Sequence, residues 1–448
     1  MKKEKSGNNI IKVVCFPDSW KIVKLKTISD ITMGQSPKSK FYNNQKEGLP
    51  LIQGNNDCKN GFTAPTIWTS YITKTCNSNS LILSVRAPVG IVSKATTRVC
   101  IGRGVCSISP KNNTGFLYYY LKYLEKWWAK LSQGSTFKSI SSKEIYNLII
   151  PSPPLPEQKK IAEILSTWDK AIEQIQNLIE AKKKLKKGLM QQLLSGRIRF
   201  PEFGKGINNN ELKFFSGKIS EEKVEAEFKK ANYKKTKAGW IPKDWECVQF
   251  IEICKLVRGP FGGSLKKEIF VQSGYKIYEQ QHAIYSDFTS GNYYINKSKY
   301  NEMKKFSLKS GDIIMSCSGT AGRFALFPEN AEKGVINQAL LKISPNTINV
   351  DTKYIFYYFH SESFQKELFT DFAGGAIKNI ASMPIIKKIP LLIPKLEEQK
   401  KIAKILTNCD EQIEVFIKKE ETLQNQKKGL MQKLLTGEVR VFRKDLNE

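Results

Sequence analysis

The chain has 448 residues, too many for one ordinary hydrophobic core, and its 40% hydrophobic content argues against a disordered protein. Its net charge of +30 points to a polyanionic partner, most commonly nucleic acid, although a lysine-rich source organism would give the same excess. No run of about 20 apolar residues and no secretory signal is present, so we expect no membrane span. Single cysteines without a CxxC pair, and only two histidines, predict reduced thiols in a cytoplasmic protein and no metal site.

Strands and one aromatic-rich helix are predicted in the first 150 residues. Residues 81–85 are apolar, partly β-branched and bounded by turn residues, so we predict a buried strand there and a second strand after Gly90. A helix follows over residues 116–131. Its three successive tyrosines from Tyr118 could stack on bases, although such a cluster is more often the core face of its helix.

A long amphipathic helix is predicted after a proline-rich lead at residues 151–156. Its apolar residues recur at alternating steps of three and four, which indicates a heptad-like seam that Lys182 alone interrupts. The seam consists of Ile161, Ile164, Trp168, Ala171, Ile175, Leu178, Leu185 and Leu189. Gly196 is expected to end the helix. About 37 residues at 1.5 Å each give a rod of roughly 55 Å.

The second half of the chain repeats these features after a connector, which we place at residues 201–240 and expect to be partly helical. Gly259 matches Gly34 at an offset of 225. Residues 313–316 match the first predicted strand, and residues 354–369 predict a second aromatic-rich helix. Between these landmarks the two halves share little sequence, so we predict one fold with two different surfaces.

The long helix is itself repeated without a gap. Residues 394–441 are identical to residues 153–200 at 24 of 48 positions, where roughly 3 would arise by chance. Two such helices can bury their apolar stripes against each other; alternatively, each packs on its own globular unit. If they run antiparallel, the two units lie at opposite ends of a rod as long as about 16 base pairs of DNA. Because the units differ in sequence, we expect a bipartite target with two different halves.

Several motifs resemble the specificity subunits of type I restriction–modification systems. The run LPEQKKIA at residues 155–162, the helix end GLMQ at residues 188–191 and the repeats of both resemble the conserved regions of that family. SVRAPVG at residues 84–90 and IGRG at residues 101–104 resemble its target-recognition domains. The chain departs from the pattern at Glu397, where the first copy has Pro156, and at residues 318–320, which read SGT where the first unit has RAP.

The resemblance spans nearly the whole chain and implies a non-catalytic DNA-recognition subunit of mixed α/β (α+β) fold. Two globular target-recognition domains stand in tandem, each followed by a long helix, and the helices pack as an antiparallel coiled-coil pair with pseudo-twofold symmetry. The predicted boundaries are residues 1–150 for the first recognition domain, 151–200 for its spacer helix, 201–240 for the linker, 241–392 for the second recognition domain and 393–442 for its spacer helix.

The resemblance also implies the partners. These are double-stranded DNA, two modification subunits that methylate adenines with S-adenosylmethionine, and restriction subunits that use ATP and magnesium. This chain is expected to hold no cofactor itself. The long helices would serve both as a ruler and as the docking surface for the modification subunits.

Polar residues on loops between the predicted strands are the candidates for DNA contacts, because Arg can bind guanine with two hydrogen bonds and Asn or Gln can do the same for adenine. In the first unit they are Gln53, Asn55, Arg86, Arg103, Ser135, Thr136 and Lys138. In the second unit they are Gln280, Gln281, Ser318, Arg323, Asn337, Lys378 and Asn379. Each could instead cap a turn or pair with a carboxylate, and the target sequence does not follow from them.

Two other functions fit the same sequence. A non-specific DNA-bridging coiled-coil protein would lose affinity steeply with salt and show no preference among sequences. An enzyme with an unrecognised site is the other possibility, although the chain has neither the Asn/Asp-Pro-Pro-aromatic motif of an amino-methyltransferase nor a GxxxxGK[ST] phosphate loop. Glu202 near Lys205 is only a weak nuclease signal.

Overall fold

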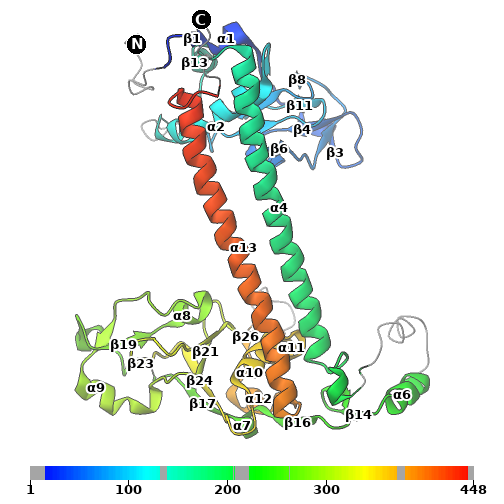
Figure 1. Ribbon diagram of the computed structural model, residues 1–448, viewed down its shortest axis with the longest axis vertical. Helices are drawn as coiled ribbons and strands as arrows, with labels where there is room; N and C mark the ends of the chain where they lie inside the picture. The colour runs from blue at the N-terminus through cyan, green and yellow to red at the C-terminus, as the bar shows by residue number, and fades with distance from the viewer. Residues whose placement is uncertain are drawn as a thin grey trace, which may run out of the picture. The chain divides into compact units, whose positions relative to one another are not determined.

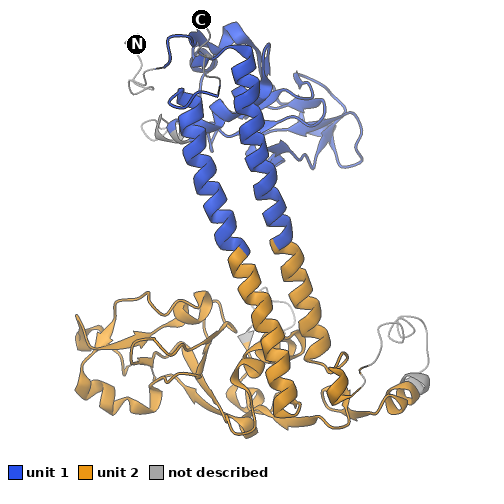
Figure 2. Cartoon of the chain, in the orientation of Figure 1, with its two compact units in different colours: residues 1–178, 416–448 blue, residues 179–415 orange. Residues whose placement is uncertain are grey.

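The computed structural model describes residues 16–131, 139–204, 206, 221–261, 263–370 and 379–441. The chain divides into two compact units (Figure 2): unit 1 comprises residues 1–178 and 416–448, and unit 2 comprises residues 179–415. Each unit combines a globular domain with parts of two long helices, so both helices contribute to both units (Figure 1). Among these residues no helix has the length and apolar character to cross a membrane.

The globular domain of unit 1 consists mainly of short strands. Its elements in chain order are β1 (Lys21–Lys24), α1 (Leu25–Ile28), β2 (Ser29–Met33), η1 (Ser39–Phe41), β3 (Tyr42–Asn43), β4 (Leu49–Ile52), η2 (Asn55–Asp57), β5 (Cys58–Lys59), β6 (Phe62–Thr63), β7 (Trp68–Thr69), β8 (Thr75–Cys76), β9 (Leu81–Ser84), β10 (Val92–Lys94), β11 (Val99–Ile101), β12 (Val105–Pro110), α2 (Thr114–Leu131), α3 (Ser142–Tyr146) and β13 (Ile149–Ser152). The long helix α4 (Leu155–Leu193) follows.

Two sheets carry this domain, one in the order β2-β12-β9-β10-β6-β5 and the other in the order β3-β7-β4-β11-β8. Strand β9 lies inside the first sheet and pairs antiparallel with both β12 and β10. All four of its residues are buried, as the apolar run of the sequence predicted. The buried strand therefore anchors the start of the loop that follows it.

Aromatic side chains of α2 fill the core of unit 1. Tyr118, Tyr119 and Tyr120 are 5%, 1% and 2% exposed, so their core role is confirmed. The same core includes Ile161 near the start of α4 and Leu434 near the end of α13 (Leu396–Thr436). Each long helix therefore packs on a globular domain at its end as well as on the other helix.

Unit 2 repeats this plan with its own elements. They are η4 (Pro201–Phe203), α6 (Glu221–Lys230), β14 (Tyr233–Thr236), β15 (Gly239–Pro242), β16 (Glu246–Gln249), α7 (Phe250–Ile253), β17 (Cys254–Arg258), η6 (Lys267–Ile269), β18 (Phe270–Val271), β19 (Tyr275–Tyr278), α8 (Gln280–Tyr285), β20 (Tyr294–Ile295), α9 (Lys297–Glu302), η7 (Lys304–Phe306), β21 (Ile313–Ser316), β22 (Phe324–Leu326), β23 (Gly334–Ile336), β24 (Leu340–Pro345), α10 (Thr352–Phe359), α11 (Glu362–Leu368), β25 (Phe369–Thr370), β26 (Asn379–Ile380), α12 (Met383–Ile386) and β27 (Pro390–Ile393). Its sheets run β17-β24-β21-β22 and β18-β20-β19-β23. Strand β21 thus takes the place that β9 has in unit 1.

The second aromatic-rich helix differs from the prediction, because residues 354–369 form two helices, α10 and α11, instead of one. The break falls at Ser361, whose hydroxyl accepts a hydrogen bond from the backbone N–H of Phe364 at 3.3 Å. A serine at this position caps the start of a new helix, which competes with continuation of the old one. The buried aromatic face is kept on both helices.

The two long helices lie side by side and antiparallel in each unit (Figure 1). In unit 1 the amide of Gln176 donates to the carboxylate of Glu420 at 2.7 Å. In unit 2 the ammonium group of Lys182 donates to the Gln412 side chain at 2.7 Å. The residue numbers of the partners in α13 decrease as those in α4 increase. This is the antiparallel order that was predicted for the two helices.

The seam between the helices is not the predicted one along its whole length. Leu178 and Leu185 are 44% and 50% exposed, whereas Ile172, Ile175 and Ile179 are buried. An α-helix has 3.6 residues per turn, so a stripe read with a 3.5-residue period drifts away from the partner. Just beyond Ile179 polar groups join the contact, and Lys182, read as an interruption, belongs to it.

Candidate nucleic-acid interface

The loop after β9 projects a charged side chain from a rigid base. The hydroxyl of Ser84 accepts the backbone N–H of Ile91 at 2.9 Å and donates to the carbonyl of Pro88 at 2.6 Å. Gly90 has a φ of +85°, which few other residues adopt, and it completes the turn. Arg86 lies two residues after Ser84, where its backbone forms a bridge with Ser139, and it is exposed. A flexible side chain is thus carried by a backbone fixed at both ends.

Unit 2 builds the same loop after β21 with a different side chain two residues after the anchoring serine. The hydroxyl of Ser316 accepts the backbone N–H of Arg323 at 3.0 Å and donates to the carbonyl of Thr320 at 2.7 Å. Ser318 therefore occupies the place that Arg86 has in unit 1. The departure at residues 318–320 is therefore a change of side chains on a shared backbone framework.

A polar cavity of about 220 Å³ brings together four of the seven candidates of unit 1. Its lining consists of Ser36, Gln53, Gly54, Asn55, Arg86, Ala87, Arg103 and Gly104, which come from four separate loops. In the described part of the chain neither Arg86 nor Arg103 forms an ion pair. Their guanidinium groups are therefore available for the edge of a guanine or for a phosphate.

Two contacts fix the shape of this cavity. The carboxylate of Asp57 accepts the backbone N–H groups of Gln53 at 2.6 Å and Gly54 at 3.1 Å, which holds the loop after β4. The hydroxyl of Ser36 accepts the backbone N–H of Arg103 at 3.0 Å, which ties two loops together. Ser36 was missed in the sequence, although the Gly34 landmark two residues earlier marked this segment.

Fewer candidates are brought together in unit 2 than in the cavity of unit 1. The hydroxyl of Ser318 donates to the side-chain oxygen of Gln280 at 3.0 Å, so these two are brought together. The amide of Gln281 donates to the Glu279 carboxylate at 3.3 Å. Arg323 is exposed, and the structure places its side chain at the end of the same loop. Ser318 and Gln280 thus lie together at the start of α8.

Asn337 serves partly as a turn residue. Its side-chain oxygen accepts the backbone N–H of Ala339 at 3.0 Å, and its own N–H donates to the carbonyl of Tyr278 at 2.9 Å. Only its side-chain NH₂ group is left for another partner. Nearby, burial raises the pKa of the Cys317 thiol to about 11, against the opposing effect of Arg258, so this thiol stays protonated at neutral pH.

Four candidates lie outside the described residues, namely Ser135, Thr136, Lys138 and Lys378. Asn379 begins β26, and its backbone pairs with Thr370 of β25. The structure therefore neither gathers these five residues with the others nor separates them.

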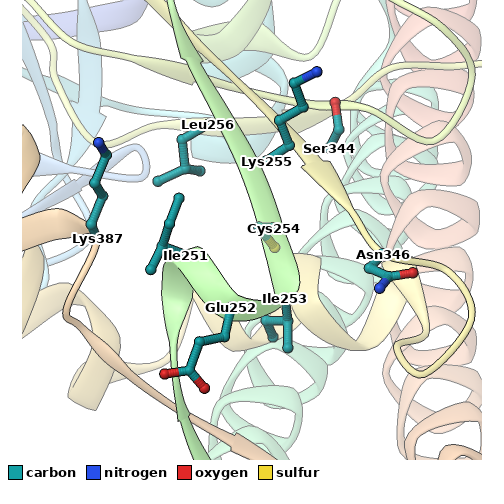
Figure 3. A pocket seen from close by; sticks show the side chains of 9 residues that line it. All are labelled: Ile251, Glu252, Ile253, Cys254, Lys255, Leu256, Ser344, Asn346 and Lys387. Atoms are coloured by element: carbon teal, nitrogen blue, oxygen red, sulfur yellow. The ribbon is translucent and has the colours of Figure 1, made fainter.

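A second cavity, of about 450 Å³, lies beside α7 and β17 (Figure 3). It is lined by Ile251, Glu252, Ile253, Cys254, Lys255, Leu256, Ser344, Asn346 and Lys387, none of which is a candidate for reading bases. In Figure 3 the apolar side chains of Ile251 and Leu256 lie between those of Lys255 and Lys387. No group of three or more metal-binding side chains occurs here or elsewhere among the described residues.

The fold and the loops together define a tandem recognition protein, in which one framework presents two different sets of polar side chains. The chain belongs to the family described as the type I restriction modification DNA specificity domain, whose model matches residues 17–183 and 242–425. Both matched segments contain one globular domain and the first part of the long helix after it. The predicted specificity-subunit family is thereby confirmed.

Individual relatives agree with this assignment. The chain is 29% identical over 337 residues to the type I restriction enzyme MjaVIII specificity subunit of Methanocaldococcus jannaschii, a match that covers 74% of this chain and 71% of the relative. It is 24% identical to the EcoBI specificity subunit of Escherichia coli, over 90% of this chain and 81% of that one.

Two solved structures share the fold. The S subunit of a type I restriction–modification system from M. genitalium matches with a TM-score of 0.53 at 16% identity, and covers 97% of this chain and 99% of its own. A chain from a study of complex assembly and conformational transition in a type I system matches with a TM-score of 0.55 at 14% identity, and covers 95% of this chain and all of its own. The tandem arrangement with long helices is therefore a known fold.

Proposed function

We propose that this specificity subunit reads an asymmetric bipartite DNA sequence, one half with each globular domain. The observation that carries the proposal is the shared serine-anchored loop, which presents Arg86 in unit 1 and Ser318 in unit 2. An arginine favours guanine, whereas Ser318 offers a hydroxyl beside the amide of Gln280, and an amide can bind adenine with two hydrogen bonds. Identical frameworks with different side chains support two half-sites of different sequence.

The long helices are the proposed ruler between the half-sites. Helices of 39 and 41 residues are about 60 Å long at 1.5 Å per residue. The same length of duplex contains about 18 base pairs. Polar bonds from Lys182 to Gln412 and from Lys186 to Asp410 keep the helices in one register, which a ruler of constant length needs.

Chemistry is assigned to partner subunits in this proposal. The chain itself is non-catalytic, and its exposed helix faces support docking of two modification subunits, which would bring S-adenosylmethionine, and of restriction subunits, which would bring ATP and magnesium. The eight described cysteines are all free thiols, which is compatible with the predicted cytoplasmic location. Double-stranded DNA is the proposed ligand, and the net charge of +30 supports it.

The decisive experiment is a genome-wide map of methylated adenines in cells that co-express this chain with its modification subunit. A gapped two-part motif that disappears without this chain is the expected result. Absence of new methylation from an intact complex would overturn the proposal. Binding that falls steeply with salt and has no sequence preference would point instead to a non-specific DNA-bridging role.

A further inference from the structure

Phe261 is the most exposed large apolar side chain in the described part of the chain. It is 94% exposed, whereas the next are Ile348 at 78% and Tyr285 at 76%. An aromatic ring that stays in water does not gain the large favourable free energy of burying its apolar surface. A side chain this exposed at a functional surface therefore suggests a ligand that covers it, whereas the same side chain elsewhere would need no explanation.

The place of Phe261 in the fold is set by its correspondence with Ser36. The N–H of Gly34 donates to the carbonyl of Val105 at 3.0 Å, and the N–H of Gly259 donates to that of Leu340 at 2.9 Å. At each glycine a Cβ atom would lie only 2.1 Å or 1.8 Å from a carbonyl oxygen of the facing loop, so neither can be replaced. Ser36 and Phe261 follow two residues later, in the same strand-to-loop exit of their units.

Ser36 lines the polar cavity that holds Gln53, Arg86 and Arg103. Gly259 lies against the carbonyl of Asn337, whose N–H donates to Tyr278 two residues before Gln280, so the chain leaves unit 2 near the edge where Gln280 and Ser318 meet. The hydroxyl of Ser36 beside the candidate residues of unit 1 thus corresponds to the exposed aromatic ring of Phe261 in unit 2. The two surfaces differ in kind as well as in hydrogen-bonding pattern.

The backbone holds this ring ready for contact. The ring of Pro260 fixes its own φ, and the carbonyl of Phe261 accepts the backbone N–H of Ser264 at 2.9 Å. An aromatic side chain has only two χ angles, so it loses little conformational freedom on binding. Apolar side chains held in this way enter between base pairs, unstack a step and bend the duplex.

We propose that Phe261 is an apolar wedge that enters the DNA at a base step of the half-site read by unit 2. This inference rests on the proposed function, because it presumes that the loops of unit 2 face DNA. Pyrimidine–purine steps unstack most easily, so the wedge would select such a step without a hydrogen bond to it. Unit 1, with Ser36 at this place, would read its half-site without such a distortion.

The test uses the complex of the full chain with its modification subunit and a duplex that carries the methylation-mapped motif. The fluorescent base 2-aminopurine replaces one base at a time through both halves, because its emission rises when a base unstacks. The adenine that is methylated is left unlabelled, since methyltransferases extrude their target base. The variants are Phe261→Ser, which installs the unit 1 residue, Phe261→Trp, which keeps an aromatic ring, and the control Ile348→Ser, which removes another exposed apolar side chain from unit 2.

The expected result is an emission rise at one step of the second half-site with the unmodified complex, with Phe261→Trp and with Ile348→Ser. Phe261→Ser should lose this rise and bind about tenfold more weakly, while emission in the first half stays unchanged. An equal rise with Phe261→Ser would overturn the wedge. So would loss of the modification subunit from Phe261→Ser with unchanged DNA binding, because Phe261 would then be a protein contact. Failure of the unmodified complex to select the motif would instead overturn the proposed function itself.

Discussion

Glu157 and Arg440 form a two-pronged ion pair across 283 residues of sequence. In unit 1 the Nε atom of Arg440 donates to Oε1 of Glu157 at 2.7 Å, and its Nη2 atom donates to Oε2 at 2.8 Å. The indole N–H of Trp20 donates to the same carboxylate at 3.1 Å. Glu157 lies in the first turn of α4, and Arg440 follows the end of α13, so the start of one helix is bound to the end of the other.

Unit 2 contains the same clasp with the roles of the helices exchanged. Arg199, after α4, donates to Glu398 in the first turn of α13 at 2.9 and 2.7 Å. Trp245 donates to Glu398 at 3.1 Å, as Trp20 does to Glu157. Both carboxylates are buried, at 2% and 1% exposure. The repeated sequence therefore folds into two equivalent junctions, each made from both copies.

Replacement of Glu157 by glutamine should destabilise unit 1. The change keeps an acceptor for Trp20 but leaves the guanidinium of Arg440 without its charge partner, and we expect a loss of about 2 kcal/mol in the free energy of unfolding. Thermal and urea unfolding would measure it. The control is Glu163→Gln, which breaks an exposed pair with Lys160 and should cost under about 0.5 kcal/mol. Equal losses from the two changes would show that the Glu157–Arg440 pair contributes no more stability than an exposed ion pair.

The junction of unit 2 should give an acid-dependent stability. Burial alone would raise the pKa of Asp244, but the hydrogen bonds and charge of Arg199 outweigh it and hold the pKa below its ordinary value of 3.8. A carboxyl with a lower pKa in the folded state stabilises the fold above its unfolded pKa and loses that contribution as the pH falls through the folded value.

We therefore expect Asp244→Asn to be less stable than the unmodified protein at pH 7, and the difference to shrink once the pH falls below about 4. Unfolding temperatures measured at pH 7 and at steps down to pH 3 would show this. A difference that stays constant over the whole series would contradict the ion-pair explanation.

Arg86 offers a test of base reading in unit 1. Arg86→Ala should weaken binding to the matched target by about 1–3 kcal/mol and relax the requirement at one position of one half-site. Arg86→Lys keeps the charge but loses the planar fork, so it should retain more of the affinity than of the selectivity. Competition binding against a set of single-base variants measures both. If both changes weaken all sequences equally, Arg86 contacts phosphate and not a base.

The ruler can be lengthened only by changing both helices, because they are paired along their length. Seven residues inserted after Leu178 and seven before Phe416 add two turns to each and preserve the seven-residue register. The rod would grow by about 10 Å, or about three base pairs. Methylation mapping should then show a gap longer by about three positions between unchanged half-sites. An unchanged gap would refute the ruler, and the same insertion in α4 alone should destabilise the pair.

Local sequence was sufficient for much of the fold. The strand at residues 81–84, the buried tyrosines of α2 and the two long helices all follow from short-range apolar patterns. The predictions were wrong where contact with a neighbouring helix or a helix cap determines the local structure. Leu185 fits a heptad but is exposed, because the helix period drifts and Lys186 faces Asp410 instead. Ser361 divides one predicted helix into two, because its hydroxyl caps a new start.

The candidate site shows the same division. Residue type and position between strands made Gln53, Arg86 and Arg103 candidates, but did not show that they share one cavity or that Ser36 joins them. Asn337 looked equally suited, yet its oxygen closes a turn. A side chain's chemistry is written in the sequence, whereas the direction in which it points depends on the loop that carries it.

By itself, the sequence determined that one element occurs twice, that its helices are long and amphipathic, and that the protein carries a large positive charge. Periodicity and composition are local or summed properties, so no structure was needed to read them. Tertiary structure alone decided that Glu157 meets Arg440 and Glu398 meets Arg199, and that Gln53, Arg86 and Arg103 line one cavity. Such pairings join residues far apart in the chain, and only the packing of the folded domains brings them together.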